Sequence, residues 1–224
     1  VGDQEFTPGW NSYDTRLQYQ TYDIASLLVQ KQNAIGIVLG DGWFRGNLGW
    51  IDGRNNWGEK LAALGEIVIE YKDGTRATIG TDESWKASKG PILESDISNG
   101  ELYDEGKELT GWSKGGYDDS NWTGVARADV SKEHLIAPEG PPVKVVNKLE
   151  PISIKKTDEG WMVDMGQNMV GWIRIKASGE SGDKITLRHA EVLDKEGNMY
   201  YENLRAAKCT NTFLLKGGTE ETLE

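Results

Sequence analysis

Residues 40–58 combine aromatic, acidic, amide and glycine residues within one short segment. The stretch reads GDGWFRGNLGWIDGRNNWG and holds three tryptophans, three asparagines, two aspartates and six glycines. Glycines make a poor core framework, and long loops of this kind are disproportionately functional. Flat rings cover the C–H faces of a sugar, while Asp, Asn and Arg supply planar hydrogen-bonding groups for its hydroxyls. The segment therefore predicts a loop that binds a neutral, hydroxyl-rich ligand.

Two loops supply the candidate binding residues. Stacking against a sugar ring is assigned to the tryptophans of the first loop: Trp43, Trp50 and Trp57. Hydrogen bonding is assigned to polar side chains of that loop and of residues 95–103: Asp41, Arg45, Asn55, Asn56, Asn99 and Glu101. Two alternatives stay open. The tryptophans plug the ends of a sandwich, since Trp is highly buried on average, or the Asn99–Glu101 segment is a structural clasp against the second module.

The same loops carry oxygen donors for a metal ion. They are acids and amides: Asp41, Asp52, Asn55, Asn56, Asp96, Asn99, Glu101 and Asp104. Calcium takes about six to eight oxygen ligands, partly from backbone carbonyls. No EF-hand spacing is present, and two histidines with one cysteine argue against zinc. Calcium is therefore the candidate ion, and solvated loop acids are the alternative.

A catalytic role has one tempting candidate, Glu191, which follows Arg188 and His189. Glycoside hydrolysis requires two carboxyl groups about 5–9.5 Å apart, one with a raised pKa. The surrounding RHAEVLDKEGN also reads as a strand that ends in a hairpin turn, with Arg188 and Glu191 in structural contacts. We favour this structural interpretation. Cys209 is expected to be a small residue in or beside a strand.

Charge and hydropathy exclude two classes of partner. The net charge is -11, and acidic and basic residues are interspersed without a basic cluster. This pattern argues against nucleic acid as a partner, because binding it requires a basic surface that contacts the phosphate backbone. No apolar run approaches the length needed to cross a membrane, so a membrane partner is not expected either.

The elements that must position these residues are short strands. Helical periodicity is confined to residues 22–30, where Asp23 is placed to cap a short turn. Strand-like runs are expected at 33–39 and 64–71, the second continuing through a turn at 72–75. After Pro141-Pro142 a new strand series begins. The series covers residues 152–155, 161–165, 169–176, 183–188 and 210–215, with Trp161 and Trp172 packed inward. We predict an all-β chain of two tandem β-sandwich modules, 1–138 and 143–224.

Five segments stand in a distinctive order along the chain. They are Phe6–Ile24, Gly40–Trp50, Ser95–Glu105, Asp164–Ile175 and Arg188–Lys208. Together they closely resemble the amino-terminal half of bacterial α-L-rhamnosidases of glycoside hydrolase family 78. Order and spacing match along essentially the whole chain.

The resemblance implies a fold and a role for each module. Residues 1–138 resemble a jelly-roll sandwich, similar to a carbohydrate-binding module, which in some members binds rhamnose and calcium. Residues 143–224 resemble the concanavalin-like sandwich that follows, and look truncated. The family's catalytic acid and base lie in an (α/α)6 barrel further along, and nothing in this sequence matches that barrel.

We therefore expect a non-catalytic, domain-sized part of a glycosidase that hydrolyses terminal α-L-rhamnosides. Its expected partners are rhamnose or a rhamnose-containing glycan and the missing barrel of the same chain. A purely structural domain that packs on that barrel is the alternative, and a free-standing hydrolase is the least favoured. A soluble bacterial protein is expected, and its compartment (cytoplasmic, periplasmic or secreted) stays open.

Overall fold

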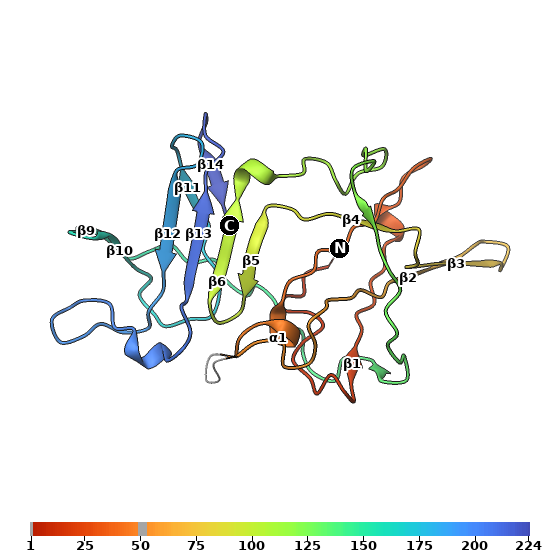
Figure 1. The fold of residues 1–224 in the computed structure, drawn as a ribbon, viewed down its shortest axis with the longest axis horizontal. Helices are drawn as coiled ribbons and strands as arrows, with labels where there is room; N and C mark the ends of the chain where they lie inside the picture. Colours follow the sequence, from red (N-terminus) through yellow and green to blue (C-terminus); the bar gives the residue numbers. More distant parts are fainter. Residues whose placement is uncertain (1, 49–52) are drawn as a thin grey trace.

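The computed structural model describes residues 2–48 and 53–224, so the candidates Trp50 and Asp52 lie outside the described residues. Short β-strands dominate the described chain (Figure 1). The strands of the first half are β1 (Leu17–Gln18), β2 (Glu66–Glu70), β3 (Arg76–Gly80), β4 (Lys86–Ala87), β5 (Ile92–Asp96), β6 (Gly100–Asp104), β7 (Thr123–Gly124) and β8 (Leu135–Ile136). Those of the second half are β9 (Ser153–Thr157), β10 (Gly160–Asp164), β11 (Ile175–Ala177), β12 (Lys184–Arg188), β13 (Thr210–Leu214) and β14 (Glu221–Leu223).

Helical structure in the described part is limited to single turns. They are α1 (Gly42–Arg45) and the 3-10 turns η1 (Ala25–Leu27), η2 (Glu105–Lys107) and η3 (Glu202–Leu204). The expected short turn is present as η1, and the Asp23 carboxylate accepts a hydrogen bond from the Ala25 amide at 2.9 Å. The N-cap position itself is Ile24, which has no side-chain cap. None of the helices in residues 2–48 and 53–224 has the length and apolar character that crossing a bilayer requires.

A four-stranded sheet in the order β12-β13-β6-β5 occupies the middle of the molecule (Figure 1). The antiparallel hairpin β5–β6 comes from the first half of the chain, and β12–β13 comes from the second. They join through a parallel pairing in which Leu102 faces Thr212 and Asp104 faces Leu214. This sheet therefore draws strands from both sides of Pro141-Pro142. The module boundaries at 138 and 143 stay a prediction.

The core lies between this sheet and the antiparallel pair β11–β14. Phe213, Leu215 and Leu223 are buried in it. Partly buried apolar side chains from both sheets surround them: Tyr103, Ile175, Ala177, Ile185 and Leu187. Apolar residues at alternate positions of facing strands bury their side chains between two layers. The predicted all-β sandwich is confirmed.

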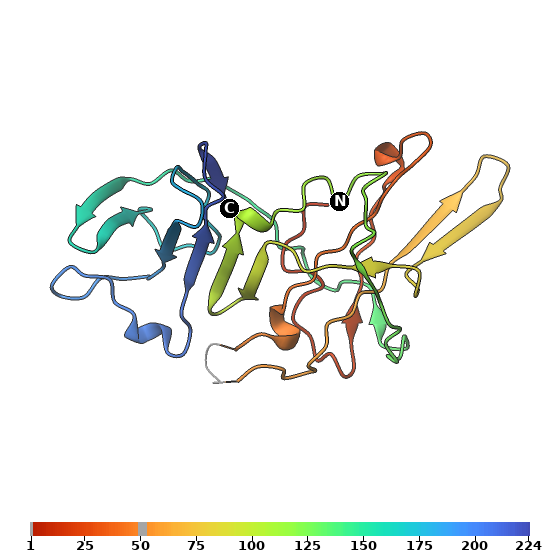
Figure 2. The same ribbon diagram turned by 45° about the horizontal axis from the view of Figure 1, so that its top comes forward.

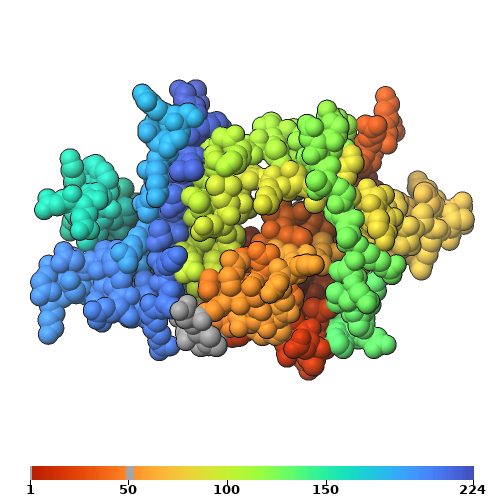
Figure 3. Space-filling view, viewed as in Figure 1, coloured from red at the N-terminus to blue at the C-terminus, as the bar shows by residue number. Residues whose placement is uncertain are grey.

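Two antiparallel hairpins extend from opposite ends of the molecule. Hairpin β2–β3 stands at one end and hairpin β9–β10 at the other (Figures 1 and 2). The space-filling view shows both projecting from the body (Figure 3). The remaining strands of the first half pair as β1–β8, which is parallel, and β4–β7, which is antiparallel.

Three expectations about elements are wrong. Residues 33–39 form no strand, and the β11 strand covers only the end of 169–176. In the first segment Gly36 lies against the Trp112 ring so closely that a Cβ there would overlap it, so the chain meets an aromatic side chain. Trp161 and Trp172 do not pack inward, since they are 67% and 45% exposed. Alternation sets which face a side chain takes, whereas burial requires a second layer over that face.

Candidate functional site

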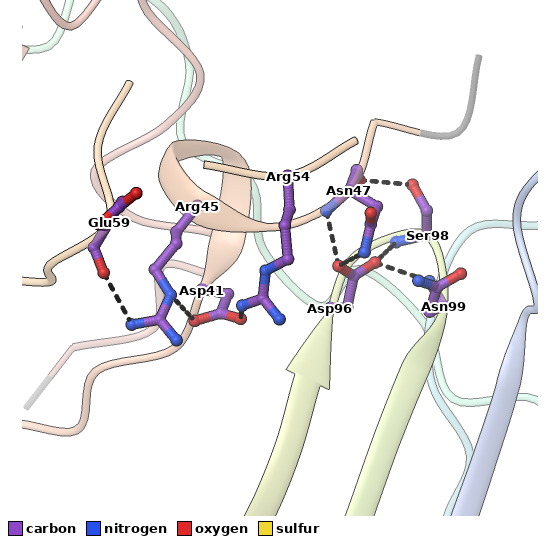
Figure 4. A network of polar contacts seen from close by, with 8 residues as sticks. All are labelled: Asp41, Arg45, Asn47, Arg54, Glu59, Asp96, Ser98 and Asn99. Atoms are coloured by element: carbon purple, nitrogen blue, oxygen red, sulfur yellow. Dashed lines mark hydrogen bonds and ion pairs between the residues drawn. The ribbon is translucent and has the colours of Figure 1, made fainter. Parts of the chain in front are cut away.

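The first loop begins with a short helix that sets an ion-pair cluster. Asp41 precedes α1, and its half-buried carboxylate lies 3.0 Å from the Nε of Arg45, one helical turn later. A second guanidinium, that of Arg54, contacts the other carboxylate oxygen (Figure 4). Arg45 also donates from Nη1 to the carbonyl of Glu59 at 3.2 Å. Through Arg54 and through the Arg45–Glu59 bond, the later part of the loop is thus held to its first turn.

A second carboxylate, Asp96, joins this loop to the turn between β5 and β6 (Figure 4). Its Oδ2 accepts from the Asn47 amide at 2.6 Å and from Asn47 Nδ2 at 3.0 Å. Its Oδ1 accepts from the amides of Ser98 at 2.9 Å and Asn99 at 2.8 Å. Burial raises the pKa of Asp96, but these hydrogen bonds outweigh it and hold the pKa below its ordinary value. The two loops named from the sequence therefore meet through one ionised side chain.

The next residues of that turn contact the second half of the chain. The carbonyl of Asn99 accepts from the Thr210 amide at 2.9 Å, and its side chain accepts from the Lys208 amide at 3.2 Å. Gly100 has φ +99°, and a Cβ there would overlap the Thr210 carbonyl oxygen. These contacts are those of the clasp that the sequence left as an alternative for Asn99.

Aromatic side chains gather beside α1. The rings of Trp43 and Trp10 stack with centroids 5.1 Å apart and an angle of 14° between planes. Trp57 lies edge-on to Tyr13 at 5.2 Å, and Tyr13 lies edge-on to Phe44 at 5.4 Å. Burial raises the pKa of Tyr13 to about 12, and its hydroxyl donates to the Gly9 carbonyl at 2.6 Å. Trp10 stays 47% exposed, so the cluster presents an indole surface to solvent.

The remaining candidates differ in their surroundings. Asn55 and Asn56 are exposed, and Asn55 has φ +64° with its amide bonded to the Arg45 carbonyl at 2.9 Å. Asn tolerates the left-handed region better than most residues. Glu101 lies on β6, where burial raises the pKa of its carboxyl. The structure thus brings Asp41, Trp43 and Arg45 together.

Two of the described acidic donors are already engaged by groups of the protein. Asp41 is held by two guanidinium groups, and Asp96 already accepts from four N–H donors. Within residues 2–48 and 53–224, no three acidic, histidine or cysteine side chains lie close enough together to hold a metal. As the structure stands, Asp41 and Asp96 are therefore poor ligands for a calcium ion.

The region around Glu191 shows structural contacts. The Arg188 guanidinium lies 3.4 Å from the centroid of the Tyr201 ring, and Asn203 donates to the Glu191 carboxylate at 3.3 Å. Burial lowers the pKa of His189. These contacts match the structural interpretation of this segment.

Three residues important to the site's geometry were not chosen from the sequence. Asn47 and Arg54 hold the loop to carboxylates, and Trp10 stacks on Trp43. Trp10 follows the Pro8-Gly9 turn signal, a cue that an aromatic is presented by a loop. Nothing local to Asn47 or Arg54 distinguishes them from other loop residues.

Comparison with known proteins adds the family. Residues 1–147 match the alpha-L-rhamnosidase N-terminal domain, and residues 154–224 match the bacterial alpha-L-rhamnosidase concanavalin-like domain. The whole chain is 41% identical to an alpha-L-rhamnosidase of Streptomyces avermitilis and covers 22% of it.

Two solved structures are similar over the whole chain. A native rhamnosidase from Aspergillus terreus superposes with a TM-score of 0.91 at 37% identity, and the chain covers 26% of it. The Streptomyces avermitilis enzyme complexed with L-rhamnose superposes with a TM-score of 0.89 at 38% identity, and 22% of it is covered. The chain thus spans about a quarter of the length of these relatives.

Proposed function

Because the chain belongs to the α-L-rhamnosidase family, we propose that it is the non-catalytic β-sandwich region of such an enzyme and that its first module binds L-rhamnose. The whole protein, on this proposal, hydrolyses terminal α-L-rhamnosides through a separate (α/α)6 catalytic domain. The chain would hold that domain and bring a rhamnose-containing glycan to it. A relative that was solved with L-rhamnose supports the choice of sugar.

The observation that carries the proposal is that an exposed indole surface lies next to an ion pair whose side chains are already oriented. Trp43 lies in the segment that also holds Asp41 and Arg45, and its ring stacks on that of Trp10. A guanidinium has five N–H donors, and Arg45 uses two of its three nitrogens in the described contacts. Sugar hydroxyls therefore find donors and acceptors that are already oriented, next to aromatic carbon.

Titration of L-rhamnose into the chain by isothermal calorimetry tests this site. We expect weak, millimolar binding, because a monosaccharide has few atoms to offset the freedom lost on association. Trp43→Ala and Asn56→Ala should each abolish the heat of binding. Trp43→Ala should cost at least about 1 kcal/mol of stability, because the ring pair contributes roughly that much beyond the area it buries. Trp161→Ala is the matched control, since this exposed tryptophan lies in the other module.

A purely structural role is the second candidate, and an exposed apolar patch on hairpin β9–β10 favours it. In hairpin β9–β10, Ile154 faces Val163 and both are exposed beside Trp161. Exposed apolar patches of this kind mark interaction surfaces. On this alternative, Trp43→Ala lowers the melting temperature by many degrees and the wild type gives no heat with L-rhamnose.

The catalytic assignment has its own assay. We expect no turnover of an aryl α-L-rhamnoside by residues 1–224. If the chain turned the substrate over and Glu191→Gln or Glu101→Gln abolished that activity, the assignment of the chain as non-catalytic would be wrong.

A further inference from the structure

The second half of the chain contains a half-open cavity of about 190 Å³. Residues from three segments line it: Asn168, Met169, His189, Glu191, Leu204 and Cys209. None of them belongs to the 40–58 loop or to hairpin β5–β6. The loop between β12 and β13 that supplies most of this lining lies beside hairpin β9–β10, away from α1 (Figures 1 and 2).

The size of the cavity suits one six-membered ring. A cavity of about 150 Å³ is large enough to bind benzene, and a single water needs only about 15 Å³. Typical drug-binding pockets begin at about 300 Å³. The cavity is therefore too large for an isolated water and too small for a large ligand.

The lining chemistry favours a neutral ligand with hydroxyl groups. Burial lowers the pKa of His189, so its imidazole is neutral near pH 7 and offers one donor and one acceptor. The Glu191 carboxylate accepts hydrogen bonds, and no lysine or arginine lines the cavity within the described chain. The nearest basic neighbour in sequence, Arg188, lies over the Tyr201 ring instead. An anion would thus meet a carboxylate without a compensating cation.

The apolar part of the lining complements these polar groups. Met169 and Leu204 supply aliphatic surface next to the Asn168 amide and the His189 ring. A pyranose has the same division, since its C–H groups and its hydroxyls point in different directions. The cavity matches this pattern without an aromatic platform.

The backbone on one side of the cavity is strained. Arg205 has φ +56° and ψ -117°, and Cys209 has φ +45°. Non-glycine residues in such conformations cost about 1–3 kcal/mol each and cluster at ligand sites. Here Cys209 is held by its amide bond to the Ser98 carbonyl at 3.1 Å and by its carbonyl bond from the His189 amide at 2.9 Å.

We propose that this cavity is a second carbohydrate site, which takes one neutral pyranose with its C–H face on Met169 and Leu204 and its hydroxyls on Asn168, His189 and Glu191. The site is independent of the 40–58 loop. It stands even if the first module binds no sugar.

Two residues of the cavity are convenient reporters. The chain has only two histidines and one cysteine, and His189 and Cys209 both line the cavity. L-rhamnose and D-glucose are titrated separately while the imidazole proton resonances are followed by NMR. At least one sugar should shift the His189 resonance, leave His134 unchanged and slow alkylation of Cys209 by iodoacetamide several-fold. D-glucuronate should do neither, because its carboxylate meets Glu191.

Matched variants locate the effect. Leu204→Trp fills the cavity and Asn168→Ala removes an exposed amide with little risk to folding, so each should abolish the His189 shift. Val170→Trp, at a neighbouring position that is 95% exposed, should keep it. Trp43→Ala should also keep it, which separates this site from the first module's site. The proposal is overturned if neither neutral sugar shifts His189, if D-glucuronate acts equally, or if Asn168→Ala responds like the wild type.

Discussion

At the residue scale, Asp96 organises the candidate site. From the sequence it was one of eight oxygen donors for a metal ion, whereas in the structure it accepts four hydrogen bonds from N–H groups. Residue type predicted an acceptor at this position. Its main partner, Asn47, lies 49 positions earlier in a glycine-rich loop, and no local pattern connects the two.

Asp96→Asn should destabilise the chain by about 2–3 kcal/mol. Hydrogen bonds to an ionised group are strong, and the amide of Asn puts a donor where Asp96 has an acceptor oxygen. Urea unfolding measures the loss. Asp73→Asn is the control, since Asp73 accepts two bonds from Thr75 in an exposed turn and its loss should cost about 1 kcal/mol or less. Equal losses in the two variants would contradict the organising role of Asp96.

The same carboxyl gives a pH dependence. The folded-state pKa of Asp96 is depressed from 3.8, so its contribution to stability is present above that value and is lost as pH falls through the folded pKa. The difference in unfolding free energy between wild type and Asp96→Asn should therefore narrow below about pH 4. Urea melts across this range check it, and a difference that stays constant into strong acid would count against it.

At the element scale, strands with clear alternation were predictable and their partners were not. Runs 64–71, 183–188 and 210–215 contain β2, β12 and β13. The turn at 72–75 predicts the pairing of β2 with β3. By contrast, residues 189–209 separate β12 from β13, and the parallel pairing of β6 with β13 joins segments that are far apart in sequence. Residues 33–39 alternate less well and meet the Trp112 ring at Gly36 in place of a strand.

Gly100→Ala tests that pairing. The variant places a Cβ in the left-handed region and against the Thr210 carbonyl, so we expect a loss of about 2–5 kcal/mol. Gly74→Ala is the matched control, because Gly74 has φ +85° with no atom near its missing Cβ, and only about 1–2 kcal/mol should be lost. Thermal unfolding compares them. Similar melting temperatures would argue against a close β6–β13 contact.

At the scale of the whole molecule, the family boundaries and the sheet do not coincide. The first family domain ends at residue 147 and the second begins at residue 154, while the central sheet combines residues 92–104 with residues 184–214. The buried hydrophobic residues among the described ones are Leu48, Phe213, Leu215 and Leu223. A core this small depends on every strand that covers it.

We expect residues 143–224 alone to lack cooperative unfolding, because the core of β13 loses Tyr103 and the pairing with β6. Residues 1–224 should unfold in one transition. Near-ultraviolet circular dichroism during heating distinguishes the two. A sharp transition in the isolated segment would show that the division near Pro141-Pro142 is also a folding boundary.

The clasp between Asn99 and Lys208 also has a consequence during synthesis, because its partners are 109 positions apart in the chain. Ribosomes add about 5–20 residues per second, so hairpin β5–β6 waits roughly 5–20 s before β13 exists to pair with it. Throughout that interval the β6 edge has unsatisfied backbone groups and is open to pairing with other nascent chains. Slower translation would lengthen this exposure, and the yield of native protein would depend on how quickly the second half is made.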